Sequence, residues 1–331
     1  MERSVGRWMG LLVAVALGWS GTARGVILYQ TSMRNTWAPS GTLLNSGWQY
    51  EGRWGQFLGT AISPRHFITA EHVGGAVGQT FTYHGKTYTT KAVYDDPKTD
   101  LRIWLVDRPF TDAYAQLYRG TSEVGKQSIF YGRGTQRGAN VVVNNQLKGW
   151  QWGAYDGQQS WGTNNIMGLV NGGTGIGTVL RYTFDANGGR NEGTVSGYDS
   201  GGGGFVNDNG VWKLAGVNYS AKGPYSRTGA NGSAFNASLF DEGGLYVGND
   251  GYRWYQADTA ANVAGGGYLS RVSAEAAWID SIIKPSIASK GLTVAAAGSP
   301  APNLGRAVPE PSMVGMGVVF AVGALARRGR R

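Results

Sequence analysis

Short runs in which apolar and polar residues alternate, separated by Gly and Asn, dominate this chain from about residue 26 to residue 270. Alternation with a period of two is typical of strands that bury one face, and Gly and Asn mark the turns between them. The pattern predicts strands at 57–62, 66–69, 80–83, 87–93, 101–106, 128–131, 179–184 and 211–217. Asn207 to Gly210, set between two apolar runs, predicts a hairpin turn. We therefore expect an all-β body, built as a barrel or a sandwich.

A helical pattern stands out at one place, residues 273–284. Apolar residues such as Ile279 fall on one face there, Ser273 can cap the first turn, and Pro285 ends the segment. The glycine run at 172–177 lacks the helix that dinucleotide and phosphate loops require, so it is predicted to be an ordinary loop.

The first 25 residues have the three-part layout of a secretory signal peptide. Arg3 and Arg7 precede an apolar run at 9–19, and small residues follow up to Gly25. The apolar run is short for a stable membrane span, which favours a cleaved signal over a buried N-terminal helix. Residues 1–25 are therefore predicted to direct export and to be removed.

The other end carries a second three-part segment, residues 309–331. Pro309-Glu310-Pro311 precedes an apolar run at 313–326, and four arginines end the chain. This tail resembles a PEP-CTERM sorting signal. The resemblance implies a Gram-negative cell, processing by a membrane-embedded exosortase and association with exopolysaccharide. A permanent weak anchor is the alternative, because the apolar run is marginal for a bilayer. Residues 291–308, rich in small residues and Pro, are predicted to be a linker.

The formal charge of +9 does not indicate nucleic acid as a partner. The two terminal segments contribute +2 and +3 of that charge, which leaves +4 on the exported body. No basic run with interleaved aromatics lies in the body. The chain has no cysteine, so we expect 12 Trp, 17 Tyr and 10 Phe to stabilise the body through its core instead of disulfides.

Candidate chemistry begins at Ser200, which has Asp199 before it and glycines after it. A serine needs a base within hydrogen-bond reach and a group that orients this base. Of the three histidines, His72 follows a predicted strand, whereas His66 lies within that strand and His84 in a turn. Asp100 opens the strand at 101–106, so its carboxylate can face the imidazole. The alternatives are an ordinary structural histidine and a plain capping aspartate.

At these residues the chain resembles the trypsin- and chymotrypsin-like serine peptidases, whose motifs are TAAH, an aspartate that opens a strand, and GDSGG. The run from Arg271 to Ile279 is similar to the RVS…WI ending of that family. The resemblance covers about residues 26–285, and the peptidase domain is assigned to 26–290.

The resemblance implies two antiparallel six-stranded β-barrels with a C-terminal helix. It also implies a serine endopeptidase that cleaves a protein or peptide substrate through an acyl-enzyme. Ser200 is then the nucleophile, His72 the general base and Asp100 the orienting acid. The backbone N–H groups of Tyr198 and Ser200 form the oxyanion hole. No cofactor and no metal are expected.

The chain departs from the family pattern at several positions. Tyr198 replaces a glycine in the oxyanion hole, Glu71 replaces a small residue before the histidine, and Gly203 replaces a proline. Thr194 stands six positions before the nucleophile, where trypsin has the aspartate that selects Arg or Lys. About 35 extra residues, at 222–265, fall where pocket walls are expected.

Two further expectations concern the chain start and metal binding. Cleavage after Gly25 would expose an amine at Val26 that could dock near Asp199, as in animal members of the family. Asp250, Asp258 and Asn249 could bind calcium, although their spacing favours surface turns.

Two other interpretations compete with a peptidase. A catalytically impaired trypsin-like pseudoenzyme could act as a surface adhesive or an exopolysaccharide-associated binding module, as Tyr198, Glu71 and the many Trp and Asn residues suggest. A β-sandwich lectin with accidental motifs is less favoured, because it would not require the three motifs in the order His, Asp, Ser.

Overall fold

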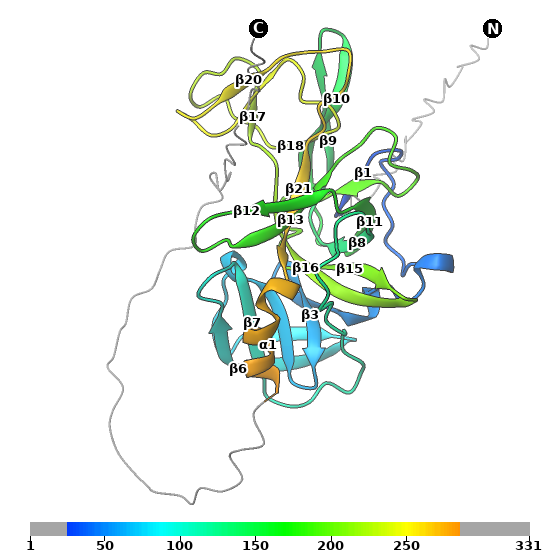
Figure 1. Cartoon of the computed structure of the whole chain (residues 1–331), viewed down its shortest axis with the longest axis vertical. Coiled ribbons are helices and arrows are strands. Elements are labelled where there is room, and N and C mark those ends of the chain that lie inside the picture. Colours follow the sequence, from blue (N-terminus) through cyan, green and yellow to red (C-terminus); the bar gives the residue numbers. More distant parts are fainter. Residues whose placement is uncertain (1–24, 285–331) are drawn as a thin grey trace, which may run out of the picture.

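The computed structural model describes residues 25–284. The predicted signal peptide at 1–25 lies outside these residues except for Gly25. The predicted linker at 291–308 and the PEP-CTERM-like segment at 309–331 lie wholly outside them. Within residues 25–284, strands dominate, and 3-10 turns and one short α-helix complete the fold (Figure 1).

The first half forms a closed antiparallel barrel with the strand order β2-β3-β4-β7-β6-β5. Its strands are β2 (Glu51–Trp54), β3 (Phe57–Ser63), β4 (His66–Ala70), β5 (Thr80–Tyr83), β6 (Lys86–Asp95) and β7 (Leu101–Val106). The 3-10 turns η1 (Gly41–Leu43) and η2 (Trp48–Tyr50) precede it, and η3 (Glu71–Val73) follows β4. Aromatic side chains such as Trp54, Phe67 and Trp104 fill the barrel and are at most 3% exposed. Large rings supply the buried apolar area that a barrel without disulfides needs.

The second half is built on a seven-stranded antiparallel sheet with the order β11-β8-β15-β16-β21-β13-β12. Its strands are β8 (Gln127–Gly132), β11 (Ser160–Asn165), β12 (Gly168–Asn171), β13 (Thr178–Thr183), β15 (Gly203–Asp208), β16 (Val211–Ala221) and β21 (Gly266–Arg271). The short strand β1 (Ile27–Leu28) pairs with β14 (Gly193–Thr194), so the start of the described chain lies beside the segment that leads to Ser200.

A separate lobe extends from the second half (Figure 1). Two three-stranded sheets, with the orders β18-β10-β9 and β17-β19-β20, form it. Their strands are β9 (Thr135–Val143), β10 (Gln146–Tyr155), β17 (Tyr225–Ser226), β18 (Ala237–Leu239), β19 (Leu245–Val247) and β20 (Trp254–Gln256). The extra residues at 222–265 therefore fold into strands, one of which pairs with the long β9–β10 hairpin.

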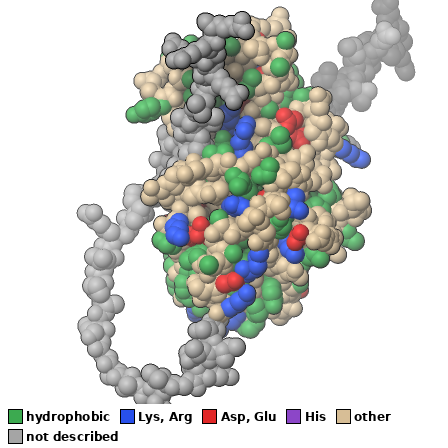
Figure 2. Space-filling model, in the orientation of Figure 1, with side chains coloured by type: hydrophobic (Ala, Val, Ile, Leu, Met, Phe, Trp, Pro, Cys, Tyr) green, Lys and Arg blue, Asp and Glu red, His purple; other side chains and the backbone are tan. Residues whose placement is uncertain are grey.

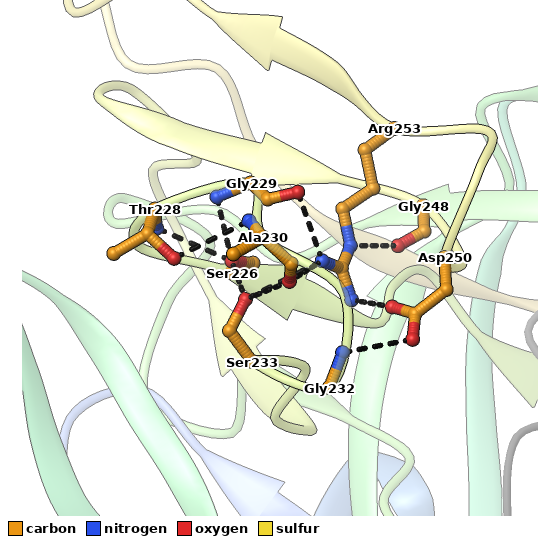
Figure 3. A network of polar contacts seen from close by, with 9 residues as sticks. All are labelled: Ser226, Thr228, Gly229, Ala230, Gly232, Ser233, Gly248, Asp250 and Arg253. Atoms are coloured by element: carbon orange, nitrogen blue, oxygen red, sulfur yellow. Dashed lines mark hydrogen bonds and ion pairs between the residues drawn. The ribbon is translucent and has the colours of Figure 1, made fainter.

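A buried arginine organises the outer end of this lobe (Figure 3). The Arg253 side chain is 4% exposed and donates to the carbonyl oxygens of Gly229 and Gly248 at 3.2 and 3.1 Å. It also pairs with Asp250, whose other oxygen accepts from the Gly232 N–H. One guanidinium thereby fixes two loops that are distant in the sequence, since its donors form a planar fork.

The C-terminal helix α1 (Ala276–Ile283) follows the 3-10 turn η4 (Ser273–Glu275). Ile279 is fully buried in a cluster that includes Ile103 of the first barrel and Leu214 of the second half. The predicted helix is confirmed, but the predicted cap is wrong: Ser273 makes no cap bond and donates instead to the buried carboxylate of Glu123 at 2.5 Å.

These observations confirm the expected all-β, chymotrypsin-like double barrel with a C-terminal helix. The second half has seven strands in its sheet, one more than expected. The turn at Asn209 and Gly210 has positive φ at both residues, as a type I′ hairpin requires, and the glycine run at 172–177 is a loop between β12 and β13.

The surface has no dominant charge on the face shown in Figure 2. Basic, acidic and hydrophobic side chains are intermixed there among other side chains and backbone atoms. No helix in the part of the chain that the structure describes is both long and apolar enough to cross a membrane.

Candidate active site

Strand register brings His72 and Asp100 together. Ala70, the last residue of β4, pairs with Leu101, the first residue of β7. The residues just beyond each of these strand ends therefore meet at the same edge of the first barrel. The N–H of Glu71 donates to the Asp100 carbonyl oxygen at 2.8 Å, which fixes the turn that carries His72.

The structure places His72 between Asp100 and Ser200. His72 Nδ1 lies 2.6 Å from Asp100 Oδ2, and the His72 backbone N–H donates to Asp100 Oδ1 at 2.9 Å. His72 Nε2 lies 2.8 Å from Ser200 Oγ. An ionised carboxylate only accepts hydrogen bonds, so Nδ1 carries the proton of a neutral ring and Nε2 accepts from the serine hydroxyl. The three predicted side chains thus form one continuous chain of hydrogen bonds.

Buried Asp199 anchors the turn before Ser200. Its Oδ1 accepts from the Gly134 N–H at 2.7 Å, and its Oδ2 accepts from the N–H and hydroxyl of Ser196 at 2.8 and 3.0 Å. Burial raises the pKa of Asp199 to about 6, although these hydrogen bonds oppose the shift. The Val26 nitrogen lies 3.4 Å from Oδ1 of Asp199, the residue near which the Val26 amine was expected to dock.

The glycines after Ser200 are required by close packing against the first barrel. Gly201 has φ +81°, and a Cβ there would collide with Thr69 Oγ1 and the Leu58 carbonyl oxygen. A residue with a side chain could therefore not bring Ser200 this close to the end of β4.

Glu51 explains why glycine replaces the family's proline at position 203. Glu51 Oε1 accepts from Thr60 Oγ1 at 2.8 Å and from the Gly203 N–H at 3.2 Å. Proline has no N–H to donate, and a Cβ at this position would lie 2.7 Å from both oxygens. Burial raises the pKa of Glu51 to about 8, and Oε2 has no hydrogen-bond partner among the described residues.

Tyr198 adopts the left-handed conformation that the family fills with glycine. Its φ is +71°, a geometry that costs a residue with a side chain about 1–2 kcal/mol. Its ring packs against Phe57, with centroids 5.9 Å apart, and against Tyr155, with centroids 4.4 Å apart. Within residues 25–284, neither the Tyr198 N–H nor the Ser200 N–H donates a hydrogen bond. Both remain available to a ligand oxygen.

Several residues of the site escaped the sequence analysis. Tyr219 packs edge-on against His72, with ring centroids 5.9 Å apart, and burial raises its pKa to about 12. Asn218 donates through Nδ2 to the carbonyl oxygens of Tyr131 and Asp199 at 2.6 and 2.8 Å. No motif marks these residues. Only the continuation of strand β16 past residue 217 could have indicated them.

The other candidate residues lie outside the site. His66 Nδ1 bonds Ser63 Oγ at 2.7 Å, and burial lowers its pKa. His84 Nε2 bonds the Gln49 carbonyl oxygen at 2.7 Å. Glu71 lies 3.8 Å from Arg102, and burial raises its pKa.

The acidic residues considered for calcium are held by cations. Asp250 pairs with Arg253, and Asp258 lies 2.7 Å from the buried ammonium of Lys148. Among residues 25–284, no group of three His, Cys, Asp or Glu side chains is placed to hold a metal ion.

Comparisons with known proteins show a resemblance at the level of solved structures only. No model of a protein family matches the chain, and no curated protein matches it. Among solved structures, the chain is similar to neuropsin, a serine protease expressed in the limbic system of mouse brain. The two share 13% sequence identity with a TM-score of 0.45, over 72% of this chain and 96% of that chain.

Proposed function

We propose that this protein is an exported serine endopeptidase that hydrolyses peptide bonds through an acyl-enzyme. The observation that carries the proposal is the unbroken chain from Asp100 to His72 at 2.6 Å and from His72 to Ser200 at 2.8 Å. Serine is a weak nucleophile at neutral pH, and such a chain is what activates it.

Each residue has a defined step. Ser200 Oγ attacks the carbonyl carbon while His72 Nε2 takes its proton, and Asp100 stabilises the imidazolium without taking a proton itself. The N–H groups of Tyr198 and Ser200 hold the oxyanion. His72 then gives the proton to the leaving amine, and water, activated by the same imidazole, releases the acid from Ser200.

Removal of the signal peptide after Gly25 gives the Val26 nitrogen a positive charge. The 3.4 Å separation from Asp199 Oδ1 supports a buried ion pair at this point. A carboxylate whose pKa is raised by burial gains most from a cation, since the charged form is then stabilised. An amine at Val26 therefore steadies the turn that presents Ser200.

The interior beside the nucleophile segment supports a substrate with a small side chain before the cleaved bond. Thr194, where trypsin has its selecting aspartate, is 1% exposed. The Tyr182 hydroxyl accepts from the Val195 N–H at 3.1 Å and leaves no room for a Cβ on Gly267. This close packing beside the Ser200 segment is the basis for proposing a preference for small substrate side chains over long or basic ones.

The location follows from the two ends. The signal peptide at 1–25 supports export, and the tail at 309–331 supports transient inner-membrane anchoring, exosortase processing and delivery to the periplasm, outer surface or matrix of a Gram-negative cell. An exopolysaccharide-associated setting follows from the same resemblance.

A fluorophosphonate probe tests the proposal, because it reacts only with an activated serine. We expect labelling of the wild-type protein at Ser200 and none of a folded Ser200→Ala variant. Folded wild-type protein that stays unlabelled would favour the pseudoenzyme with a binding role. Cleavage-site profiling with a peptide library then tests the preference for small residues.

A further inference from the structure

We propose that Tyr155 and Phe57 are positioning residues that hold Tyr198, and with it the oxyanion-binding N–H, in the active arrangement. The inference rests on the proposed function and deepens it, since it names what governs the formation of the oxyanion site. Neither side chain touches the reacting atoms. Both act through the ring of Tyr198.

A hydrogen bond to the Gly197 carbonyl oxygen sets the orientation of the Gly197–Tyr198 peptide. The Gly197 carbonyl oxygen accepts from the Thr135 N–H at 3.0 Å, at the start of β9. In a planar trans peptide the C=O and the N–H point in opposite directions. The Tyr198 N–H therefore points away from β9. Rotation of this peptide would turn a carbonyl toward the oxyanion and remove one of its two donors.

The backbone conformation of Tyr198 is strained. With φ at +71°, the residue occupies a region that side chains disfavour. Glycine would adopt this geometry without strain, whereas tyrosine needs surrounding contacts to keep it there. The strain favours a rotated peptide unless the ring of Tyr198 is held.

Two aromatic rings from different parts of the fold hold the ring of Tyr198 in place. Phe57 opens β3 of the first barrel, and Tyr155 ends β10 of the second half, with centroids 5.9 and 4.4 Å from Tyr198. The Tyr155 hydroxyl donates to the Gln56 carbonyl oxygen at 3.0 Å. Arg133 adds a second link by donating to the Gly55 and Gly157 carbonyl oxygens. The turn before Phe57 and the end of β10 are thus tied to each other around Tyr198.

The contacts explain how the chain tolerates tyrosine at this position. An aromatic pair contributes the equivalent of about a two- to tenfold change in an equilibrium constant beyond its buried area. Two such pairs are comparable with the strain of a left-handed residue. Removal of one ring is therefore enough to make the rotated peptide a major state.

A double-mutant cycle tests the inference with a short peptide p-nitroanilide that the wild-type protein hydrolyses. We expect Tyr155→Ala to lower kcat about tenfold and to leave KM within about twofold, because the oxyanion forms only after substrate has bound. In a Tyr198→Gly background the same substitution is expected to change kcat less than about twofold, since glycine keeps a positive φ without support from neighbouring rings.

Three controls separate positioning from general stability. Tyr155→Phe keeps the ring and loses only the bond to Gln56, so it is expected to stay within about threefold of wild type. Phe57→Ala is expected to behave like Tyr155→Ala in both backgrounds. Tyr252→Ala, at an exposed aromatic of the lobe, is expected to leave kcat unchanged. Thermal unfolding confirms that each variant is folded.

A crystal structure of Tyr155→Ala gives a readout that does not depend on activity. We expect the Gly197–Tyr198 peptide to be rotated, with the Gly197 carbonyl released from Thr135. An unrotated peptide, or an equal loss of kcat with and without the Tyr198→Gly substitution, would overturn the inference. Failure of the wild-type protein to label or hydrolyse would instead overturn the proposed function, and the crystal structure would still decide the role of Tyr155.

Discussion

The two halves of the molecule contribute to the site in different ways. The first barrel closes where β2 pairs with β5, and its two contributions, His72 and Asp100, are 28 residues apart and lie just beyond the ends of the paired strands β4 and β7. The second half joins strands that are distant in sequence and supplies Ser200, 128 residues from His72. Its β10 strand continues into a lobe that has no counterpart in the first half.

This difference between the halves implies that one part of the site is rigid and another can change its conformation. His72 and Asp100 are fixed by the register of two neighbouring strands, β4 and β7, in a closed barrel. Ser200 and Tyr198 lie on a turn that depends on contacts from both halves: Asp199, Glu51 and the rings around Tyr198. Substitutions that remove contacts to this turn are therefore expected to lower activity more readily than substitutions elsewhere in the supporting structure.

Removal of the reacting groups has the largest expected effect, and it tests whether both halves are needed. Ser200→Ala and His72→Ala are each expected to lower kcat about 10⁵–10⁶-fold, because the two residues act as a unit. Peptide hydrolysis under saturating substrate is the measurement. His66→Ala is the matched control in the first barrel, and its activity is expected to stay near the wild-type value.

Asp100→Asn probes the rigid half alone. Asparagine keeps the shape but favours the wrong imidazole tautomer, so kcat is expected to fall about 10³–10⁴-fold. Asp95→Asn, at an exposed ion pair with Arg102, is the control and is expected to change kcat little. A similar loss in both variants would contradict the role of Asp100.

Glu51→Gln tests the contact between the halves through pH. The folded-state pKa of Glu51, about 8, lies above its ordinary value of 4.5. Its stabilising contribution is therefore complete below pH 4.5 and is lost as the pH rises through 8. The free energy of unfolding of wild type, from denaturant titrations, is expected to fall between pH 5 and pH 8 by about 2–4 kcal/mol more than that of the variant.

A partly exposed carboxylate, Asp208, provides the control for this measurement. Asp208→Asn is expected to leave the pH dependence of unfolding between pH 5 and pH 8 close to that of wild type, since the pKa of Asp208 is lowered, not raised. Equal pH profiles for wild type and Glu51→Gln would show that the buried carboxyl does not titrate in this window.

Arg253→Met gives the smallest expected effect on turnover. Loss of the guanidinium leaves the carbonyls of Gly229 and Gly248 unpaired, so amide hydrogen exchange in residues 226–256 is expected to quicken. Hydrolysis of a short p-nitroanilide is expected to stay within about twofold of wild type. A large loss of activity would show that the outer lobe is coupled to the site more tightly than the contacts indicate.

The sequence predicts much of the first half. Alternation locates its strands to within a few residues, because each buries one face, and the motifs at His72, Asp100 and Ser200 identify side chains that the structure brings together. The catalytic roles of these residues stay predictions. So do the oxyanion donors and both terminal signals.

The contacts that set the adjustable half could not be predicted. Phe57 and Tyr155 are about 140 and 43 positions from Tyr198, and no local pattern links such distant residues. The pairing of β10 with β18 likewise joins segments almost 90 residues apart. The hydrogen bond from the Gly203 N–H to Glu51 depends on how the two barrels pack. The sequence around Gly203 or around Glu51 alone does not indicate that packing.

That bond also constrains how this sequence can change over time. Replacement of Gly203 by proline alone would remove the N–H that donates to Glu51. Loss of Glu51 alone would leave the buried Gly203 N–H without its acceptor. Relatives are therefore expected to alter both positions together or neither.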